Sequence, residues 1–267
     1  MSSIKSPLVS IIMNCHNGEK YLNTSIKSIL SQSYNNWELI FWDNNSQDNS
    51  KKILLKYKDK RIKYFKSKKL LKLYHARNLA VNKARGKYIS FLDVDDYWSK
   101  NKLKKQVSFF SKNQNYKILY SNFYIIDKKK KIKKKKVSIN YLPSGAITQK
   151  IIDNYKVGIL TVMLNKSLFK NIKFKNTYSI IGDFDLIVRL SLKFKIGCIQ
   201  EPLAYYRVHN SNFSRNYKLH IEELIDWLKK NRSIMKKNSF ILNSIRKQIG
   251  VLMLKNYIKL LGRVVQW

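Results

Sequence analysis

The chain of 267 residues is long enough for one large domain, or for one domain with a small appendage. Its 54 Lys and Arg residues against 16 Asp and Glu give a formal charge of +38, yet a hydrophobic content of 44% excludes a globally disordered chain. The two cysteines, Cys15 and Cys198, lie in unrelated contexts, which argues against a zinc site or a disulfide framework.

The first hundred residues alternate between apolar runs, which predict buried strands, and segments with helical spacing. This alternation predicts right-handed crossovers and a mostly parallel sheet covered by helices on both faces. The predicted strands are 8–13, 37–42, 62–65 and 87–92, and the predicted helices are 18–32, 50–57 and 74–84.

Polar clusters follow three of these strands at the point where each strand ends. They are residues 14–17, 43–46 and 93–96. Ligands of parallel sheets bind beyond the carboxyl ends of the strands. We therefore expect the three clusters to converge on one edge of the sheet and to form a site.

The third cluster crowds Asp93, Asp95 and Asp96 together in a protein with few acidic residues. Like charges this close repel one another, and each carboxylate loses hydration there. In an extended segment Asp93 and Asp95 point to the same side, and their oxygen atoms suit Mg²⁺ or Mn²⁺ shared with a diphosphate. Alternatively, Asp95 or Asp96 caps a following helix, which is compatible with metal binding.

In the second half, strands predicted at 116–126 and 137–141 bracket a lysine-rich run at 128–136. This run is either a nucleic-acid or lipid patch or the solvated tip of a hairpin. Further on, the patterns predict a helix at 182–193 and two strands, 195–199 and 204–208, joined by a turn at 200–202.

The chain is predicted to be helical from Tyr217 onward, as a basic amphipathic extension over residues 215–267. Lys255, Lys259 and Arg263 lie opposite an apolar stripe. Such a segment can lie on an anionic membrane surface, and packing against the rest of the protein or against a partner chain is equally open. The stripe consists of Ile241, Ile245, Ile249, Leu252, Ile258, Leu261 and Val265.

Five stretches between about residues 7 and 214 resemble glycosyltransferase family 2, in the order typical of that family. The ordered set is more specific than a single D-x-D, which recurs in many surface loops. The resemblance implies the GT-A fold, an α/β fold with a Rossmann-like, mostly parallel sheet, in which 1–98 binds the nucleotide sugar and 99–214 faces the acceptor. The stretches are VSIIMNCHNGEKYL (9–22), ELIFWDNNSQD (38–48), HARNLAVNKARGKYISFLDVDDYW (75–98), GDFDLIVRL (182–190) and EPLAYYRVHNSNFS (201–214).

The resemblance also implies a nucleoside pocket at the ends of the first two strands. Asp43 would hydrogen-bond the nucleoside, and Cys15, His16, Asn17 and Ser46 would shape the pocket around it. The family commonly has Pro-Thr-Tyr at positions 14–16, so this sequence departs from the pattern where the base would stack.

Further residues are implied in diphosphate and metal binding. Arg77 would contact the base or the diphosphate, its alternative being an ion pair on a helix. Asp93 would face the ribose or sugar, and Asp95 would coordinate the metal, with Asp93 as a further ligand. Arg207 would lie near the diphosphate, and His209 would either ligate the metal or satisfy a loop carbonyl.

Asp183 matches the family's catalytic base, which deprotonates the acceptor hydroxyl. A base needs a pKa suited to its operating pH, and burial would raise that of Asp183. The alternative is that Asp183 only starts its helix, where negative charge is favoured. Asp185 is expected to support the structure, and Gly182 replaces the acid that usually precedes the base.

We therefore expect a metal-dependent, inverting glycosyltransferase that acts in polysaccharide biosynthesis. It would move a sugar from a nucleotide-diphosphate donor to a hydroxyl of a glycan or lipid-linked acceptor, and UDP is the expected nucleotide. The rivals are an inactive glycosyltransferase-like scaffold and a basic polyanion-binding protein, and no specific nucleic acid is expected as a partner. No P-loop motif occurs. The absence of an apolar run of about 18–20 residues and of a signal peptide predicts a cytoplasmic protein, free or on the inner face of the membrane.

Overall fold

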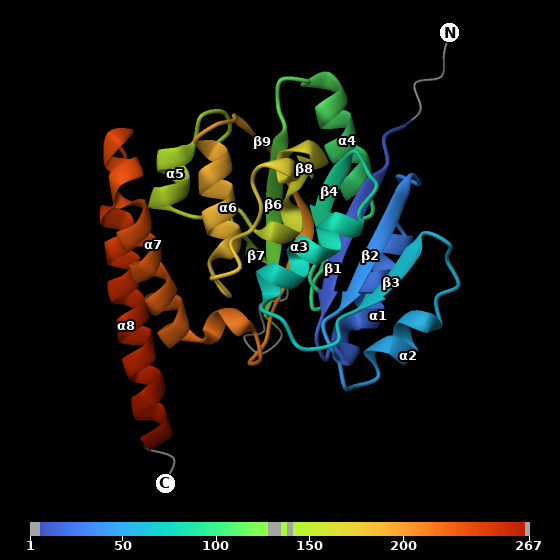
Figure 1. The fold of residues 1–267 in the computed structure, drawn as a ribbon, viewed down its shortest axis with the longest axis horizontal. Helices are drawn as coiled ribbons and strands as arrows, with labels where there is room; N and C mark the ends of the chain where they lie inside the picture. The colour runs from blue at the N-terminus through green and yellow to red at the C-terminus, as the bar shows by residue number, and fades with distance from the viewer. Residues whose placement is uncertain (1–5, 128–134, 138–140, 265–267) are drawn as a thin grey trace.

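The computed structural model describes residues 6–127, 135–137 and 141–264, and it consists of a central sheet with helices on both faces (Figure 1). In the described part of the chain the sheet has nine strands in the order β3-β2-β1-β4-β8-β6-β9-β5, with β7 paired to β6. The strands are β1 (Val9–Cys15), β2 (Trp37–Asp43), β3 (Ile62–Lys66), β4 (Tyr88–Phe91), β5 (Tyr97–Trp98), β6 (Ile118–Asp127), β7 (Lys135–Lys136), β8 (Met163–Asn165) and β9 (Ile196–Val208). The α-helices are α1 (Glu19–Leu30), α2 (Ser50–Leu55), α3 (Leu73–Lys83), α4 (Lys102–Lys112), α5 (Thr148–Asp153), α6 (Gly182–Ser191), α7 (Tyr217–Lys237) and α8 (Asn243–Val264), and short 3-10 helices include η3 (Phe213–Arg215).

Strands β1 to β4 form the parallel half of the sheet, joined by α1, α2 and α3. Every residue of β1 and β2 is buried, because helices cover both faces of the sheet. Their continuous apolar runs are the pattern that such double burial requires. The predicted α/β fold is confirmed here, and the predicted boundaries differ from the observed ones by at most two residues.

The second half of the sheet mixes directions. β8 runs antiparallel between β4 and β6, whereas β9 runs parallel to β6. The two strands predicted at 195–199 and 204–208 are one strand, β9, so the predicted turn at 200–202 is wrong. The ladder shifts register opposite Asn122, which pairs with Pro202. An irregularity of this kind accommodates a proline that cannot donate to the ladder.

The short strand β7 pairs antiparallel with β6 and lies inside the lysine-rich run rather than at the predicted 137–141. This pairing favours the hairpin interpretation of the run. Residues 128–134 and 138–140, which include most of that run and most of the predicted strand, lie outside the described residues.

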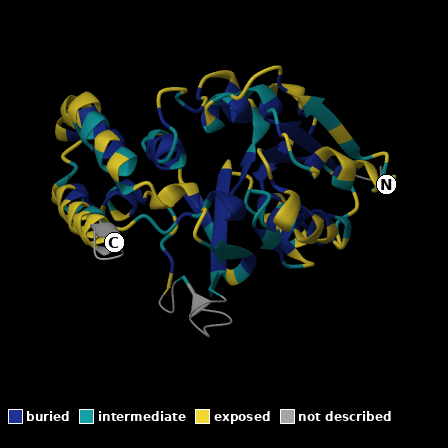
Figure 2. Ribbon diagram, turned by 90° about the horizontal axis from the view of Figure 1, so that it is seen from below, coloured by how far each residue is buried: buried dark blue, intermediate teal, exposed yellow. Residues whose placement is uncertain are grey.

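The C-terminal extension is two antiparallel helices instead of one continuous helical segment (Figure 1). Leu224 and Trp227 of α7 are buried in the same core cluster as Phe184 of α6. The outer faces of the two helices are exposed (Figure 2). Packing against the rest of the chain, one of the alternatives for this extension, is therefore observed.

The predicted apolar stripe divides between a buried and an exposed part. Ile245, Ile249 and Leu252 are buried, whereas Ile258 and Leu261 are exposed. Ile241 precedes α8 and is exposed, and Val265 lies outside the described residues. None of the helices within the described ranges is long and apolar enough to cross a membrane.

One lysine lies in the core of the protein. Lys102, the first residue of α4, is fully buried, and its Nζ donates hydrogen bonds of 2.7 Å to Ser90 Oγ and to Gln106 Oε1. Nζ also lies 3.9 Å from the centroid of the Trp98 ring. Burial holds the pKa of Lys102 well below its usual value, which favours the neutral amine.

Candidate active site

A cavity of about 480 Å³ lies beyond the carboxyl ends of the parallel strands, where the sequence predicts a site. Residues from α3, from the loop after β4, from α6 and from the segment after β9 line it. The lining residues run from His16 to Ser214, so the cavity brings together side chains that are far apart in the sequence. The predicted site residues among them are His16, Arg77, Asp93, Asp95 and Asp183.

Backbone contacts fix the acidic loop that follows β4. Ser25 of α1 donates its hydroxyl to the carbonyl oxygens of Val94, at 2.6 Å, and Asp96, at 2.5 Å. The buried carboxylate of Asp96 accepts the N–H of Arg207 at 2.8 Å, which ties the loop to the end of β9. Burial, and then the charges of Asp95 and Asp93, raises the pKa of Asp96 well above its usual value.

The alternative role of Asp95 and Asp96 as caps of a following helix is not observed. The strand β5 follows the loop, and the next helix, α4, begins only at Lys102. Its N-cap residue is Asn101, with no side-chain capping hydrogen bond.

Arg77 and Asp93 form an ion pair between α3 and the acidic loop. The Arg77 side chain is only 3% exposed, and Asp93 is partly open to the cavity. The alternative for Arg77 was an ion pair on a helix, and the observed ion pair joins helix α3 to the acidic loop instead. It leaves a buried guanidinium at the wall of the cavity, beside the carboxylate predicted to face the sugar.

Asp95 and His209 form a second pair, with 2.9 Å between Asp95 Oδ2 and His209 Nε2. Burial, and then the charge of Asp93, raises the pKa of Asp95. Asn212 lies beside both groups, its Nδ2 being 3.1 Å from His209 Nε2 and 3.4 Å from Asp95 Oδ2.

A carboxylate and an imidazole at this distance are suitable ligands for Mn²⁺ or Mg²⁺. Within the described ranges no ready-made group of three or more His, Cys, Asp or Glu side chains could hold a metal ion. The donor set therefore fits an ion whose remaining positions are filled by substrate phosphate and water, the usual state of Mg²⁺ at nucleotide sites. Asp93 is turned to Arg77, so Asp95 and His209 are the better-placed ligands of the predicted three.

Asp183 lies in the first turn of α6 and lines the same cavity. Its Oδ1 accepts the N–H of Phe184 at 2.9 Å and lies 3.2 Å from the hydroxyl of Tyr74. Burial raises the pKa of Asp183, and the positive charge of Arg77 partly opposes that rise. A carboxylate with a raised pKa, bordered by a cavity, is suited to accept a proton.

Tyr74 explains the glycine that precedes Asp183. A Cβ at Gly182 would lie 2.7 Å from Tyr74 Cγ and still nearer to Cδ2 and Cε2 of the same ring. The Tyr74 hydroxyl also donates to the carbonyl oxygen of Ile180 at 2.9 Å. The aromatic ring thus occupies the space beside the candidate base that a side chain at position 182 would need, which composition and spacing do not reveal.

Two acidic residues hold the segment around Asp183 in place. Glu223 of α7 accepts the backbone N–H groups of Ser179, Ile180 and Ile181 at 2.6 to 3.0 Å. Asp185 is fully buried and accepts from Arg189, at 2.8 Å, and from Trp227 Nε1, at 3.1 Å. The structural role expected for Asp185 agrees with these contacts, and Glu223 was not singled out by any motif.

The five residues of the implied nucleoside pocket lie together. Asp43 Oδ1 accepts the N–H of Ser46 at 2.7 Å, and Oδ2 accepts the hydroxyl of Tyr64 at 2.7 Å. The N–H of Asn17 donates to Ser46 Oγ at 3.1 Å. His16 Nδ1 lies 3.1 Å from the carbonyl oxygen of Asn44, and Cys15 is buried against Ser46.

Arg207 does not line the cavity, although the preceding residue, Tyr206, does. Its guanidinium lies over the ring of Tyr21, 4.5 Å from the centroid, and 5.5 Å from that of Tyr97. The Tyr21 ring also lies 5.0 Å from that of His209. Arg207 thus packs on Tyr21, which in turn contacts His209, and its backbone N–H donates to Asp96.

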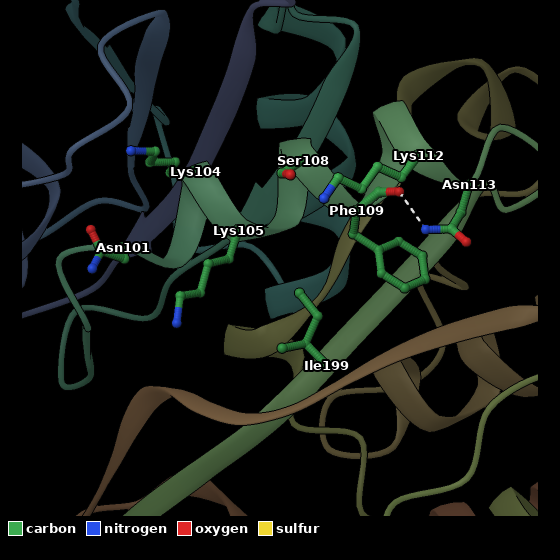
Figure 3. Close-up of a pocket in the computed structure, with 8 residues that line it drawn as sticks. All are labelled: Asn101, Lys104, Lys105, Ser108, Phe109, Lys112, Asn113 and Ile199. Carbon is green, nitrogen blue, oxygen red and sulfur yellow. Dashed lines mark hydrogen bonds between the residues drawn. The ribbon is translucent and has the colours of Figure 1, made fainter.

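A different hollow, of about 450 Å³, lies on the outer face of α4 (Figure 3). Lys104, Lys105 and Lys112 border it, and Ile199 of β9 forms its apolar floor. It contains no carboxylate, histidine or cysteine, so it lacks the groups needed for acid–base chemistry. The acidic cavity is the candidate active site.

The sequence matches known proteins over most of its length. Residues 10–186 match the family described as Glycosyl transferase family 2. The chain is 37% identical over 211 residues to the Escherichia coli UDP-Glc:alpha-D-GlcNAc-diphosphoundecaprenol beta-1,3-glucosyltransferase WfgD. The aligned region covers 78% of this chain and 80% of that protein. The chain is also 31% identical over 221 residues to the putative teichuronic acid biosynthesis glycosyltransferase TuaG of Bacillus subtilis, covering 79% and 82% of the two chains.

Solved structures share the fold. TarS of S. aureus in complex with UDP-GlcNAc superposes with a TM-score of 0.62 at 17% identity, covering 82% of this chain and 66% of that one. The mannosyltransferase PcManGT of Pyrobaculum calidifontis, in complex with GDP-Man and Mn²⁺, gives a TM-score of 0.63 at 11% identity, covering 85% and 65%. At such low identity the likeness concerns the fold alone, and it confirms the predicted GT-A class. Together with the family match and the relative that is 37% identical, it shows that this chain belongs to glycosyl transferase family 2 and is a glycosyltransferase.

Proposed function

We propose that the protein transfers a hexosyl group from a UDP-sugar to a hydroxyl of a lipid-linked glycan, with inversion at the anomeric carbon. One observation carries the proposal: Asp183, with its raised pKa, lines the same cavity as Arg77, Asp93 and Asp95. The named relatives support the substrates, since one uses UDP-Glc and a diphosphoundecaprenol-linked GlcNAc and another serves teichuronic acid biosynthesis.

In the proposed reaction Asp183 accepts the proton of the acceptor hydroxyl. The oxygen attacks the anomeric carbon from the face opposite the diphosphate, a new C–O bond forms, and the electron pair of the old bond leaves with UDP. Asp93 orients the sugar, held in place by Arg77. A divalent cation held by Asp95 and His209 would neutralise the departing diphosphate, and a neighbour of this fold binds Mn²⁺.

The nucleoside would bind at the first half of the chain, residues 1–98, and the acceptor at the second, residues 99–214. Asp43 has both oxygen atoms engaged by Ser46 and Tyr64. Its contribution is then to fix the loop that shapes the nucleoside pocket, together with Cys15, His16 and Asn17.

Calorimetric binding of UDP, GDP and CDP, with and without Mn²⁺, tests the donor assignment. We expect Mn²⁺-dependent binding of UDP that is lost in Asp95→Ala. Absence of binding of all three nucleotides to the wild-type protein would favour the inactive scaffold or the polyanion binder instead.

We also propose that α8 contacts an anionic membrane surface on the cytoplasmic side. The end of this helix exposes Leu254, Tyr257 and Ile258 alongside Lys255 and Lys259, on a protein of net charge +38. Apolar side chains flanked by lysines suit the interface of an anionic bilayer. Flotation with vesicles of phosphatidylglycerol should carry the protein upward at physiological salt, and a protein that stays at the bottom would contradict this contact.

A further inference from the structure

A second cavity, of about 490 Å³, shares three wall residues with the first: Ile180, Asp183 and Ser214. Its other walls come from the end of α5, from α6 and from the two C-terminal helices. The candidate base therefore borders both cavities. The family match ends at residue 186, so the walls built by α7 and α8 lie outside it.

Two buried polar atoms at this second cavity have no hydrogen-bond partner among the described residues. They are the hydroxyl oxygen of Tyr155 and Nδ1 of His220, and both residues line the cavity. Leaving a buried polar atom without a partner destabilises the folded protein. A hydroxyl-rich ligand in the cavity would supply both missing partners, whereas an apolar ligand would not.

A cationic side chain stands at the rim where α8 passes the cavity. Lys247 lines the cavity together with Ser244 and Gln248 of the same helix. Four residues further along α8, Val251 also lines it, and it begins a row of exposed apolar side chains. Spacings of three and four place Lys247 and this row on one face of the helix. The row continues with Leu254, Ile258 and Leu261.

We propose that the second cavity is the acceptor subsite and that Lys247 binds the phosphate of a lipid-linked acceptor. The sugar then lies beside Asp183, between Tyr155 and His220, and the lipid chain leaves along the apolar row of α8. Leu261 follows Val251 by ten positions, so the row extends over about 15 Å of helix at 1.5 Å per residue. This inference rests on the proposed glycosyl transfer, because it assigns the second substrate of the same base.

Calorimetry with decyl diphosphate, in saturating UDP and Mn²⁺, tests the subsite. UDP fills the donor cavity, so the probe reports a separate site. We expect Lys247→Ala to weaken binding about tenfold or more, the effect of losing a charge-assisted hydrogen bond. Arg246→Ala removes the same charge from the neighbouring position of α8 and should leave the affinity unchanged. Gln248→Trp fills the cavity with an indole and should abolish binding.

The outcomes separate the two proposals. No UDP binding to the wild-type protein contradicts the proposed function itself. UDP binding without binding of decyl diphosphate overturns the acceptor subsite alone. Equal affinities in Lys247→Ala and Arg246→Ala, or unchanged binding in Gln248→Trp, overturn it as well. UDP binding by each variant also verifies that the variant is folded.

Discussion

Replacing Gly182 by alanine tests the contact between Tyr74 and the start of α6. The new Cβ would lie 2.7 Å from Tyr74 Cγ, whereas non-bonded carbons sit about 3.5–4.0 Å apart. The ring must therefore retreat by roughly 1 Å. It is confined, because Tyr74 is buried, stacks on Phe174 at 5.2 Å and donates to Ile180.

The expected loss follows from two opposing effects. Overpacking of a core costs about 1–3 kcal/mol, and three ring atoms in close contact favour the upper part of that range. Alanine recovers up to about 1 kcal/mol of unfolded-state entropy. The net loss in the free energy of unfolding is about 1–2 kcal/mol, which for a chain of this size is a fall in Tm of about 2–4 °C. Turnover should also fall, since the ring carries the hydroxyl that contacts Asp183.

Thermal denaturation of Gly182→Ala beside Gly250→Ala isolates the ring contact. A Cβ at Gly250, within α8, meets nothing within 4 Å, so that variant should be as stable as the wild type or more so. In a Tyr74→Leu background the penalty of Gly182→Ala should largely disappear. Equal shifts of Tm for the two alanine variants would contradict the clash.

Four further outcomes are expected. Asp183→Asn should lower turnover by about 10²- to 10⁴-fold with UDP binding retained, and unchanged turnover would remove Asp183 as the base. Burial raises the pKa of Asp183, and only its ionised form accepts a proton, so kcat/KM should fall with decreasing pH through a pKa above the ordinary value of an aspartate. Tyr74→Phe should move this fall to higher pH, since the Tyr74 hydroxyl lowers the pKa of Asp183. His209→Ala should reduce the Tm gain that Mn²⁺ gives in the presence of UDP, measured by thermal shift. Burial lowers the pKa of Lys102, so the unfolded chain binds a proton at this residue more readily than the folded protein does below pH of about 10.4. The Tm of the wild type should therefore fall relative to that of Lys102→Met as the pH drops from 10 to 7.

The parallel half of the fold is predictable because its strands are continuous apolar runs that end in turn residues. β1 and β2 need no distant partner to be recognised, and the loops after them converge as the rule for parallel sheets requires. β5 and β8 have only two and three residues, and pairing with β9, β4 and β6 defines them. Contacts between distant segments define these strands, and local sequence carries no sign of them.

The residue types at the site were predictable, and their partners were not. The acidic loop and Asp183 follow from motif order, but the pairs Arg77–Asp93 and Asp95–His209 join segments 16 and 114 positions apart. The partner of each charged side chain depends on how α3 and β9 pack against the acidic loop, and no local sequence pattern encodes that packing. The turn predicted around Pro202 is wrong for the same reason. Pro202 lies within a strand because its neighbour β6 pairs with it at a shift in register, and the local sequence does not show that pairing.

The hydrogen bonds from residues 179–181 to Glu223 have a consequence for folding during synthesis. Glu223 supplies acceptors for three consecutive backbone N–H groups just before Asp183, and it is encoded some 40 positions later. During synthesis the parallel half, which begins at β1, can fold as it leaves the ribosome, because N-terminal parts fold first. The segment before the candidate base can form its hydrogen bonds to Glu223 only after α7 has emerged. Nascent chains that stop short of α7 are then expected to acquire the donor half before they can catalyse transfer.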